Sequence, residues 1–237
     1  MSTSEEGPVL KTRIGRLVLT SMAVAIIAAV TVFILVTRDG GSPSQASDTR
    51  GADPGTAQVV RENSHRLNEV PDAPVTVVEF LDFECEGCRA AYPLVEELRA
   101  QYGDRVEFVL RYFPLSGHFN GERAARSVEA AAQQGKLEPM YHKMYETQAE
   151  WGEQRVPADD VFRGFAEELG LDMAAYDAAY ADPATAERVA LDMADGEALG
   201  VMGTPTFFVN GMQIPLQSRE DLRVAVESAL ANTAPVS

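Results

Sequence analysis

The sequence predicts an α/β domain in which a strand–helix–strand unit is followed by a long helical segment, a strand hairpin and a closing helix. Three observations support this prediction. An apolar run at residues 75–81 leads into a Cys-x-x-Cys pair at residues 85–88. Apolar residues recur at helical spacing through most of residues 120–200, and strand-like residues return at 206–214. An uncharged segment long enough to cross a membrane precedes the domain.

The N-terminal part differs in composition from the rest of the chain. Residues 17–36 carry no charge, and a helix of this length crosses about 30 Å of hydrocarbon. Basic residues precede the run, so the positive-inside rule places residues 1–16 in the cytoplasm. We predict a single-pass transmembrane helix at 17–37 in the cell membrane, with the remaining chain outside the cytoplasm. A cleaved signal peptide is the alternative, although no small-residue cleavage site follows the run.

The segment after the predicted span has the composition of a linker. Residues 38–58 are rich in glycine, serine, proline and aspartate and contain few bulky apolar side chains. They cannot bury enough apolar surface to offset the entropy lost on ordering, so we expect a flexible stalk. Residues 59–231 have the size of one ordinary domain, and residues 232–237 are expected to form a disordered tail.

The chain is strongly acidic, with 36 aspartate and glutamate residues against 20 lysine and arginine residues and a net charge of −16. Two of the acidic and three of the basic residues precede the apolar run, so the part expected outside the cytoplasm carries about −17. Such a field repels phosphate backbones and offers no attraction to anionic lipid, which argues against nucleic acid as a partner. The membrane is expected to be reached through the N-terminal helix.

The strand–helix–strand unit follows from its spacing. Residues 75–81 predict a buried strand, and the helix after Cys88 has one apolar stripe, formed by Ala91, Leu94, Val95, Leu98 and Tyr102. Residues 105–113 predict a second strand. A strand, helix and strand in this order imply parallel pairing with a right-handed crossover.

The second half of the domain is predicted to be helical before it returns to strands. Residues 120–200 form the helical segment. Residues 206–209 are strand-like, and Asn210-Gly211 is a strong two-residue hairpin signal that returns the chain as an edge strand. A closing helix then follows, with apolar residues Leu222, Val226 and Leu230 on one face.

The Cys85-Glu86-Gly87-Cys88 motif contains both cysteines of the chain. A strand that places such a pair at the start of a helix favours thiol–disulfide exchange, because the helix dipole and free amides stabilise the first sulfur as a thiolate. A zinc site would need further ligands at suitable spacing, and a structural disulfide with two intervening residues restricts the unfolded chain little. A copper site that uses both cysteines with a histidine remains an alternative from another class.

Two motifs separated by the helical segment resemble those of DsbA-like disulfide oxidoreductases of the thioredoxin superfamily. They are EFLDFECEGCR at 79–89 and GTPTFFVNG at 203–211. The nearest likeness is to the membrane-tethered, exported type found in actinobacteria. The resemblance implies a thioredoxin fold (βαβ-ββα) with a helical insertion at about 120–200. It also implies that Cys85 is the nucleophile and that Cys88 is the resolving thiol. A cis Pro205 would face the cysteine pair, and the Thr204 backbone would pair with the extended substrate chain.

The resemblance places a buried acid at Glu79, and the alternation of the first strand puts Glu79 on the same face as apolar neighbours. A desolvated carboxyl group there has a raised pKa and can exchange a proton with Cys88. The dipeptide Glu86-Gly87 departs from the Pro-His that DsbA-type sites often have. We expect Glu86, together with Asp82 and Glu84, to oppose the thiolate, keep the pKa of Cys85 above about 5 and make a weaker oxidant.

The resemblance implies an enzyme that forms disulfides in folding exported proteins and that is re-oxidised by a membrane redox partner. No cofactor and no metal are expected. The alternatives are a disulfide reductase or isomerase, for instance in cytochrome c maturation, a copper-binding chaperone, and a non-catalytic module that binds extended chains. His118 and His142 are interpreted as packed or solvated side chains without a catalytic role.

Overall fold

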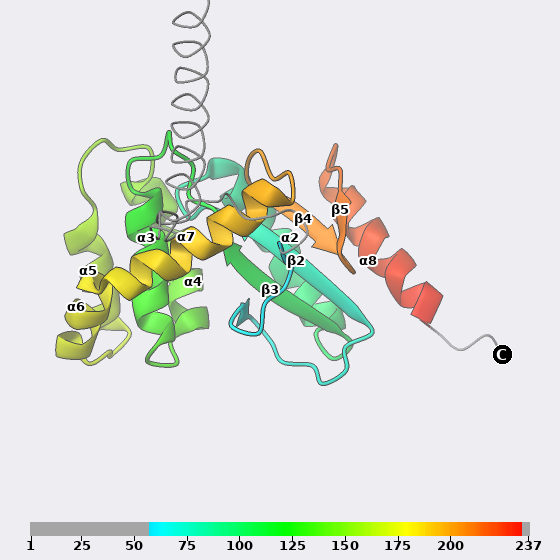
Figure 1. Cartoon of the computed structure of the whole chain (residues 1–237), viewed down its shortest axis with the longest axis horizontal. Coiled ribbons are helices and arrows are strands. Elements are labelled where there is room, and N and C mark those ends of the chain that lie inside the picture. The colour runs from blue at the N-terminus through cyan, green and yellow to red at the C-terminus, as the bar shows by residue number, and fades with distance from the viewer. Residues whose placement is uncertain (1–56, 234–237) are drawn as a thin grey trace, which may run out of the picture. The chain divides into compact units, whose positions relative to one another are not determined.

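The computed structural model describes residues 57–233. The predicted cytoplasmic segment 1–16, the predicted transmembrane helix 17–37 and all but the last two residues of the predicted stalk 38–58 lie outside the described residues. Within residues 57–233, none of the helices combines the length and the apolar character that a membrane span requires. The described part has the predicted α/β architecture with inserted helices (Figure 1).

The five strands form one mixed sheet in the order β1-β3-β2-β4-β5. Their bounds are β1 His65–Arg66, β2 Val75–Leu81, β3 Val106–Tyr112, β4 Thr206–Val209 and β5 Met212–Ile214. β2 and β3 are parallel, as the sequence predicts, whereas β1, β4 and β5 pair antiparallel with their neighbours. Asn210 and Gly211 both have positive φ, at 48° and 79°, as the predicted hairpin turn between β4 and β5 requires.

Seven helices are described between residues 57 and 233. They are α2 Glu86–Tyr102, α3 Gly121–Ala132, α4 Leu137–Trp151, α5 Asp159–Glu168, α6 Met173–Ala181, α7 Pro183–Ala198 and α8 Arg219–Thr233. Figure 1 shows α3 to α6 gathered beside the sheet, with α8 next to β4 and β5 at the other side. The predicted tail at 232–237 begins too early, because α8 continues to Thr233, whose hydroxyl donates to the carbonyl of Leu230.

The sheet is covered on both faces, so β2 is almost fully buried. Val77 and Leu81 pack into the core cluster that contains the apolar residues of α2 and α8. Val78 and Phe80 point to the opposite face and pack with residues at the end of α7. A Cβ at Gly196 of α7 would lie 2.7 Å from the ring of Phe113, so this glycine permits the close approach of α7 to the sheet. The site at the end of β2 therefore rests on a strand that is fixed from both sides.

A buried ion cluster fixes the start of the domain. The guanidinium of Arg111 on β3 donates to Asp192 at 2.6 Å and to Asp195 at 2.5 Å, and all three side chains are fully buried. Arg111 also donates to the carbonyl of Gln58 at 2.8 Å, and Arg61 pairs with Asp195. The chain is thus anchored at residue 58, which the sequence analysis assigns to the stalk.

Candidate active site

Cys85 and Cys88 lie where β2 delivers the chain to α2. Cys85 is the N-cap of α2, and its carbonyl accepts a hydrogen bond from the N–H of Arg89 at 3.1 Å. Cys85 is 8% exposed and Cys88 is fully buried. The free amides and the positive end of the helix dipole therefore lie next to the Cys85 sulfur, as the sequence analysis expects.

The two thiols differ in acidity. The hydrogen bond from the Cys88 thiol is the largest effect that lowers the pKa of Cys85 to about 6, and the Thr204 side chain and the amides of Cys88 and Gly87 add to it against the opposing effect of burial. Burial raises the pKa of Cys88 well above its ordinary value, and the hydrogen bond to Cys85 and the charge of Glu79 act in the same direction. One sulfur is thus set up to be a thiolate and the other to hold its proton.

Glu79 lies on β2 beneath the cysteine pair and is 5% exposed, which confirms the burial expected from strand alternation. Burial raises the pKa of Glu79 to about 8, and the charges of Cys85 and Glu96 contribute. One carboxyl oxygen has no hydrogen-bond partner among the described residues. A cavity of about 10 Å³ with mainly apolar walls adjoins the carboxyl group. Glu79 is therefore mostly protonated at neutral pH, next to the sulfur with the raised pKa.

The loop before β4 faces the pair. The Thr204–Pro205 peptide bond is cis, as the resemblance implies, and the carbonyl oxygen of Thr204 lies 3.3 Å from Sγ of Cys85. A Cβ at Gly87 would lie 3.2 Å from Cδ of Pro205 and 3.5 Å from Sγ of Cys85. The second residue of the Glu86-Gly87 dipeptide thus leaves room for the proline loop to approach the reactive sulfur.

The side chain of Asp82 makes several contacts within the loop that leads to Cys85. Its side chain is buried, and its carboxylate accepts the N–H groups of Glu84 and Leu115, both at 2.8 Å. Its third contact is with Nδ1 of His118 at 2.6 Å. The carboxylate is therefore held by the backbone and by an imidazole, two interactions that sequence proximity does not reveal.

Glu84 is likewise turned inward. Its carboxylate accepts the N–H of Asn120 at 2.5 Å and the N–H of Glu153 at 3.0 Å, while burial raises the pKa of Glu84. Glu86, in contrast, is exposed in the first turn of α2. The three acids expected to act alike therefore have three different surroundings, with two of them tying the inserted helices to the loop at the cysteines.

Two residues at the site have no local signal in the sequence. Gln148 of α4 is buried and donates to the carbonyls of Phe83 at 2.7 Å and Cys85 at 3.0 Å. His118, which the sequence analysis interprets as packed or solvated, contacts Asp82 in the active-site loop. His142 instead bonds to the hydroxyl of Tyr92 at 2.7 Å. Only the fold shows which of these distant polar side chains reaches the cysteines.

A groove of about 340 Å³ adjoins the pair. It runs between the first turns of α2, the proline loop and the start of α8, and its walls include Gly87, Leu94, Pro205, Phe207 and Leu216. Its mostly apolar walls and its position beside Cys85 suit the side chains of an extended polypeptide bound next to a reacting cysteine.

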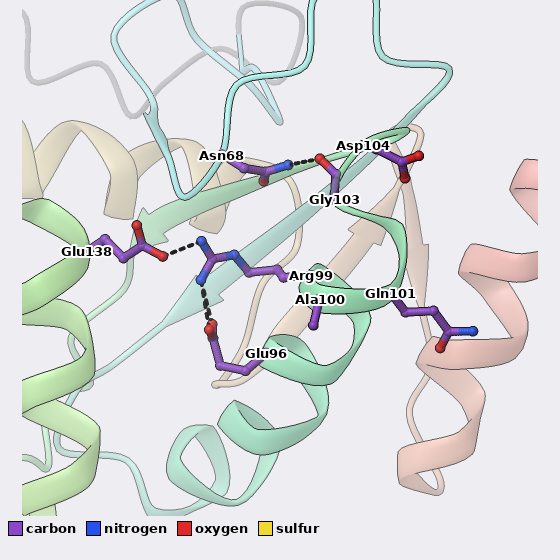
Figure 2. A pocket seen from close by; sticks show the side chains of 8 residues that line it. All are labelled: Asn68, Glu96, Arg99, Ala100, Gln101, Gly103, Asp104 and Glu138. Carbon is purple, nitrogen blue, oxygen red and sulfur yellow. Dashed lines mark hydrogen bonds and ion pairs between the residues drawn. The ribbon is translucent and has the colours of Figure 1, made fainter.

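A larger polar hollow lies at the far end of α2. It has a volume of about 610 Å³, and Figure 2 shows Arg99 reaching across it between Glu96 and Glu138. Arg99 donates to these carboxylates at 2.8 Å and 2.6 Å, so its charge is already compensated. Arg99 follows Cys85 by 14 residues, which corresponds to roughly 21 Å along a helix. The hollow is therefore separate from the cysteine site.

The comparison with protein families settles the relationship of this chain. The family model described as Thioredoxin matches residues 70–228, which include the cysteine pair and the proline loop. The chain belongs to the thioredoxin family. Among solved structures, it is similar to a thioredoxin-like oxidoreductase from Silicibacter pomeroyi DSS-3, with 30% identity and a TM-score of 0.61 over 74% of this chain and 96% of that one. This thioredoxin-family protein thus shares the fold of a thioredoxin-like oxidoreductase.

More distant structures share the fold of this thioredoxin-family protein. BdbD from Bacillus subtilis is 20% identical, with a TM-score of 0.63 over 71% of this chain and 93% of BdbD. The α-DsbA1 protein of Wolbachia pipientis is 16% identical, with a TM-score of 0.63 over 74% of this chain and 96% of that one.

The similar curated proteins are much longer. The Na(+)/H(+) antiporter NhaA of Herminiimonas arsenicoxydans is 39% identical over 143 residues, which are 60% of this chain and 22% of that protein. NhaA 1 of Salinispora arenicola is 41% identical over 164 residues, which are 68% of this chain and 24% of that protein. This thioredoxin-family chain thus spans about a quarter or less of the length of the curated relatives it matches.

Proposed function

We propose that this protein forms disulfide bonds in exported proteins and that Cys85 and Cys88 are its redox pair. The observation that supports this best is the position of Cys85 at the N-terminus of α2. Its Sγ lies 3.3 Å from the carbonyl oxygen of Thr204, the residue before cis Pro205. The raised pKa of the buried Cys88 and the lowered pKa of Cys85, about 6, give the two sulfurs separate tasks. Cys85 reacts with the substrate thiol, and Cys88 forms or breaks the disulfide bond with Cys85.

The reaction is a two-step exchange that starts from the Cys85–Cys88 disulfide. A substrate thiolate attacks Sγ of Cys85, a sulfur–sulfur bond forms between them, and the bond to Cys88 breaks with its electron pair on Cys88. A second substrate thiolate then attacks the substrate sulfur of this mixed disulfide, and Cys85 leaves as a thiolate. The substrate loses two electrons and gains a disulfide, while the enzyme pair is reduced. A sulfur with a pKa of about 6 is a good leaving group at neutral pH.

Glu79 supplies a proton in the first step. With a pKa of about 8 it is mostly a carboxylic acid at neutral pH. The thiolate that forms on Cys88 is buried and strongly basic, so it takes a proton readily. Transfer from Glu79 to Cys88 moves the single negative charge from the strongly basic sulfur to the less basic carboxylate. When the pair is re-oxidised the proton returns to Glu79.

Thr204 and Pro205 present the substrate to the sulfur. The apolar groove beside Cys85 takes side chains of an extended, unfolded segment, and the Thr204 backbone pairs with that segment next to the mixed disulfide. Extended chains are found in proteins that are still folding, which fits the introduction of disulfides during folding. Gly87 keeps the approach to the sulfur open.

We place this chemistry outside the cytoplasm, on a domain tethered by the apolar segment at 17–37. Stable disulfides form in oxidising compartments, and the sequence pattern puts residues 59–231 on that side of the membrane. A membrane-bound redox partner would re-oxidise the pair after each turnover. The curated relatives are named as Na(+)/H(+) antiporters, but the match covers less than a quarter of their length, so no ion transport is proposed for this chain.

The equilibrium potential of the pair tests the direction of the reaction. The full-length protein is equilibrated with mixtures of reduced and oxidised glutathione, and the fraction of the Cys85–Cys88 disulfide is measured by thiol labelling. We expect a potential between those of thioredoxin and DsbA, about −270 and −120 mV, because the Cys85 pKa of about 6 lies between theirs. A potential at or below about −270 mV would assign the protein to disulfide reduction instead.

A further inference from the structure

Asp82 and Glu84 form a buried acidic cluster in the loop that leads from β2 to Cys85. Both residues are only 1% exposed, and the N–H of Cys85 donates to the carbonyl of Asp82 at 3.1 Å. A carboxylate in this position adds a fixed negative charge close to the sulfur. In a medium of low dielectric constant such a charge opposes the formation of a thiolate.

The structure places an imidazole on this acidic cluster. Nδ1 of His118 lies 2.6 Å from Oδ2 of Asp82, and its Nε2 lies 3.6 Å from Oε1 of Glu153. The N–H of Leu115 donates to the same Asp82 carboxylate, and the N–H of His118 donates to the carbonyl of Leu115 at 3.0 Å. The segment between β3 and α3 therefore holds the ring against Asp82 through its own backbone, and the ring is only one-fifth exposed.

The surroundings of the ring favour its charged form. Burial by itself lowers the pKa of His118, but the hydrogen bond to Asp82 and the charges of Asp82, Cys85 and Glu153 raise it above its ordinary value. Glu84 lies in the same loop, and its carboxylate already accepts hydrogen bonds from two backbone N–H groups. The dipeptide Glu86-Gly87 supplies no positive charge to the sulfur.

We propose that His118 is a positioning residue for redox chemistry at Cys85, whose protonated ring neutralises the buried Asp82 carboxylate and so favours the Cys85 thiolate. This inference rests on the exchange chemistry proposed above and names a residue that increases the oxidising strength of the Cys85–Cys88 pair. Without the imidazolium, the negative charges of Asp82 and of the thiolate, a few residues apart in the same loop, would repel each other more strongly. The reduced enzyme would then be less stable relative to the disulfide, and the enzyme a weaker oxidant.

The coupling between His118 and Cys85 must act in both directions. If the imidazolium favours the thiolate, the thiolate raises the pKa of His118 by the same free energy. Conversion of the pair to a disulfide removes the thiolate, so the pKa of His118 falls on oxidation. A histidine with only a packing role would titrate identically in the two redox states.

The test uses the full-length protein with His118→Gln, which keeps polar groups at this position but removes the charge. His142→Gln is the matched control, because His142 is a half-buried histidine bonded to Tyr92 and away from the acidic loop. The pH dependence of thiolate absorbance gives the pKa of Cys85, and equilibration with glutathione gives the redox constant. We expect His118→Gln to raise the pKa of Cys85 by about one unit and to weaken the oxidant about fivefold near neutral pH. His142→Gln should change neither.

An unchanged Cys85 titration in a folded His118→Gln protein, or an equal change in His142→Gln, would overturn the inference. Should His118→Gln not fold, NMR titration of His118 in the wild-type protein decides instead. A higher pKa in the reduced than in the oxidised state supports the inference, and equal values overturn it. These outcomes are separate from the proposed function, which fails only if the wild-type pair does not exchange with thiols.

Discussion

Substitution of Cys85 by serine is expected to abolish disulfide exchange, whereas substitution of Cys88 is expected to trap the reaction halfway. The Cys85 sulfur is attacked in the first step and leaves as a thiolate in the second, whereas a serine hydroxyl forms no disulfide and is a poor leaving group. In Cys88→Ala, Cys85 still exchanges with an activated substrate disulfide, but no neighbouring thiol resolves the product. We expect resolution of the mixed disulfide to slow by at least about 100-fold, because an intramolecular step is lost.

The measurement is non-reducing electrophoresis after mixing each variant with a peptide that bears a mixed disulfide. Cys88→Ala is preferred to Cys88→Ser because a serine hydroxyl could still donate a hydrogen bond to the Cys85 sulfur, as the Cys88 thiol does. Cys85→Ser should give no covalent complex, and the wild-type protein only a transient one. Accumulation of a complex through Cys88 in Cys85→Ser would reverse the assignment of the two sulfurs.

Substitution of Glu79 by glutamine is expected to change stability and activity in opposite directions. The pKa of Glu79 is about 8 in the folded protein and 4.5 as the ordinary value, so between these limits the folded state holds a proton that the unfolded state has lost. The free energy of unfolding therefore falls by about 1.4 kcal/mol per pH unit as the pH rises through this window, or about 3 kcal/mol by neutral pH. Glutamine at position 79 does not ionise, so the free energy of unfolding of Glu79→Gln should not show this fall with pH. Activity should fall at least about tenfold, because the proton donor to Cys88 is gone.

Denaturant unfolding of the reduced full-length protein near pH 4 and near pH 7 isolates the effect. The gain in stability of Glu79→Gln over wild type should be larger by about 2 to 3 kcal/mol at the higher pH. Glu69→Gln is the control, since it removes a carboxylate from an exposed position instead of a buried one. A pH-independent difference in Glu79→Gln would mean that Glu79 ionises normally and cannot serve as the proton donor proposed here.

The parts of the fold that depend on local pattern could be predicted from the sequence. β2 and the hairpin at Asn210-Gly211 follow from apolar runs and turn chemistry, which act over a few residues. The burial of Glu79 follows from alternation along one strand. β1 was not predicted, because its two residues, His65 and Arg66, form a strand only by pairing with Leu110 and Val109 of β3. No local pattern can encode such a short partner.

The parts of the site that the sequence could not reveal are contacts between distant segments. Asp82 and Glu84 lie close to Cys85 in the chain, which predicts that they oppose the thiolate but not which groups hold their carboxylates. The fold turns both carboxylates toward the linkers around α3 and α4, where backbone N–H groups and His118 hold them. Gln148, 63 residues from Cys85, reaches the active-site loop in the same way. These contacts depend on how the inserted helices pack and leave no periodic signal.

The central claim is that Cys85 is a reactive thiolate at neutral pH while Cys88 keeps its proton. The most direct measurement is the rate of alkylation of the reduced, folded protein as a function of pH, with the modified cysteine located by mass spectrometry. We expect modification of Cys85 alone, with a rate that rises around a midpoint of about 6 and a Cys88 that stays unmodified. Equal modification of both cysteines, or a Cys85 that reacts only above about pH 9, would contradict the account.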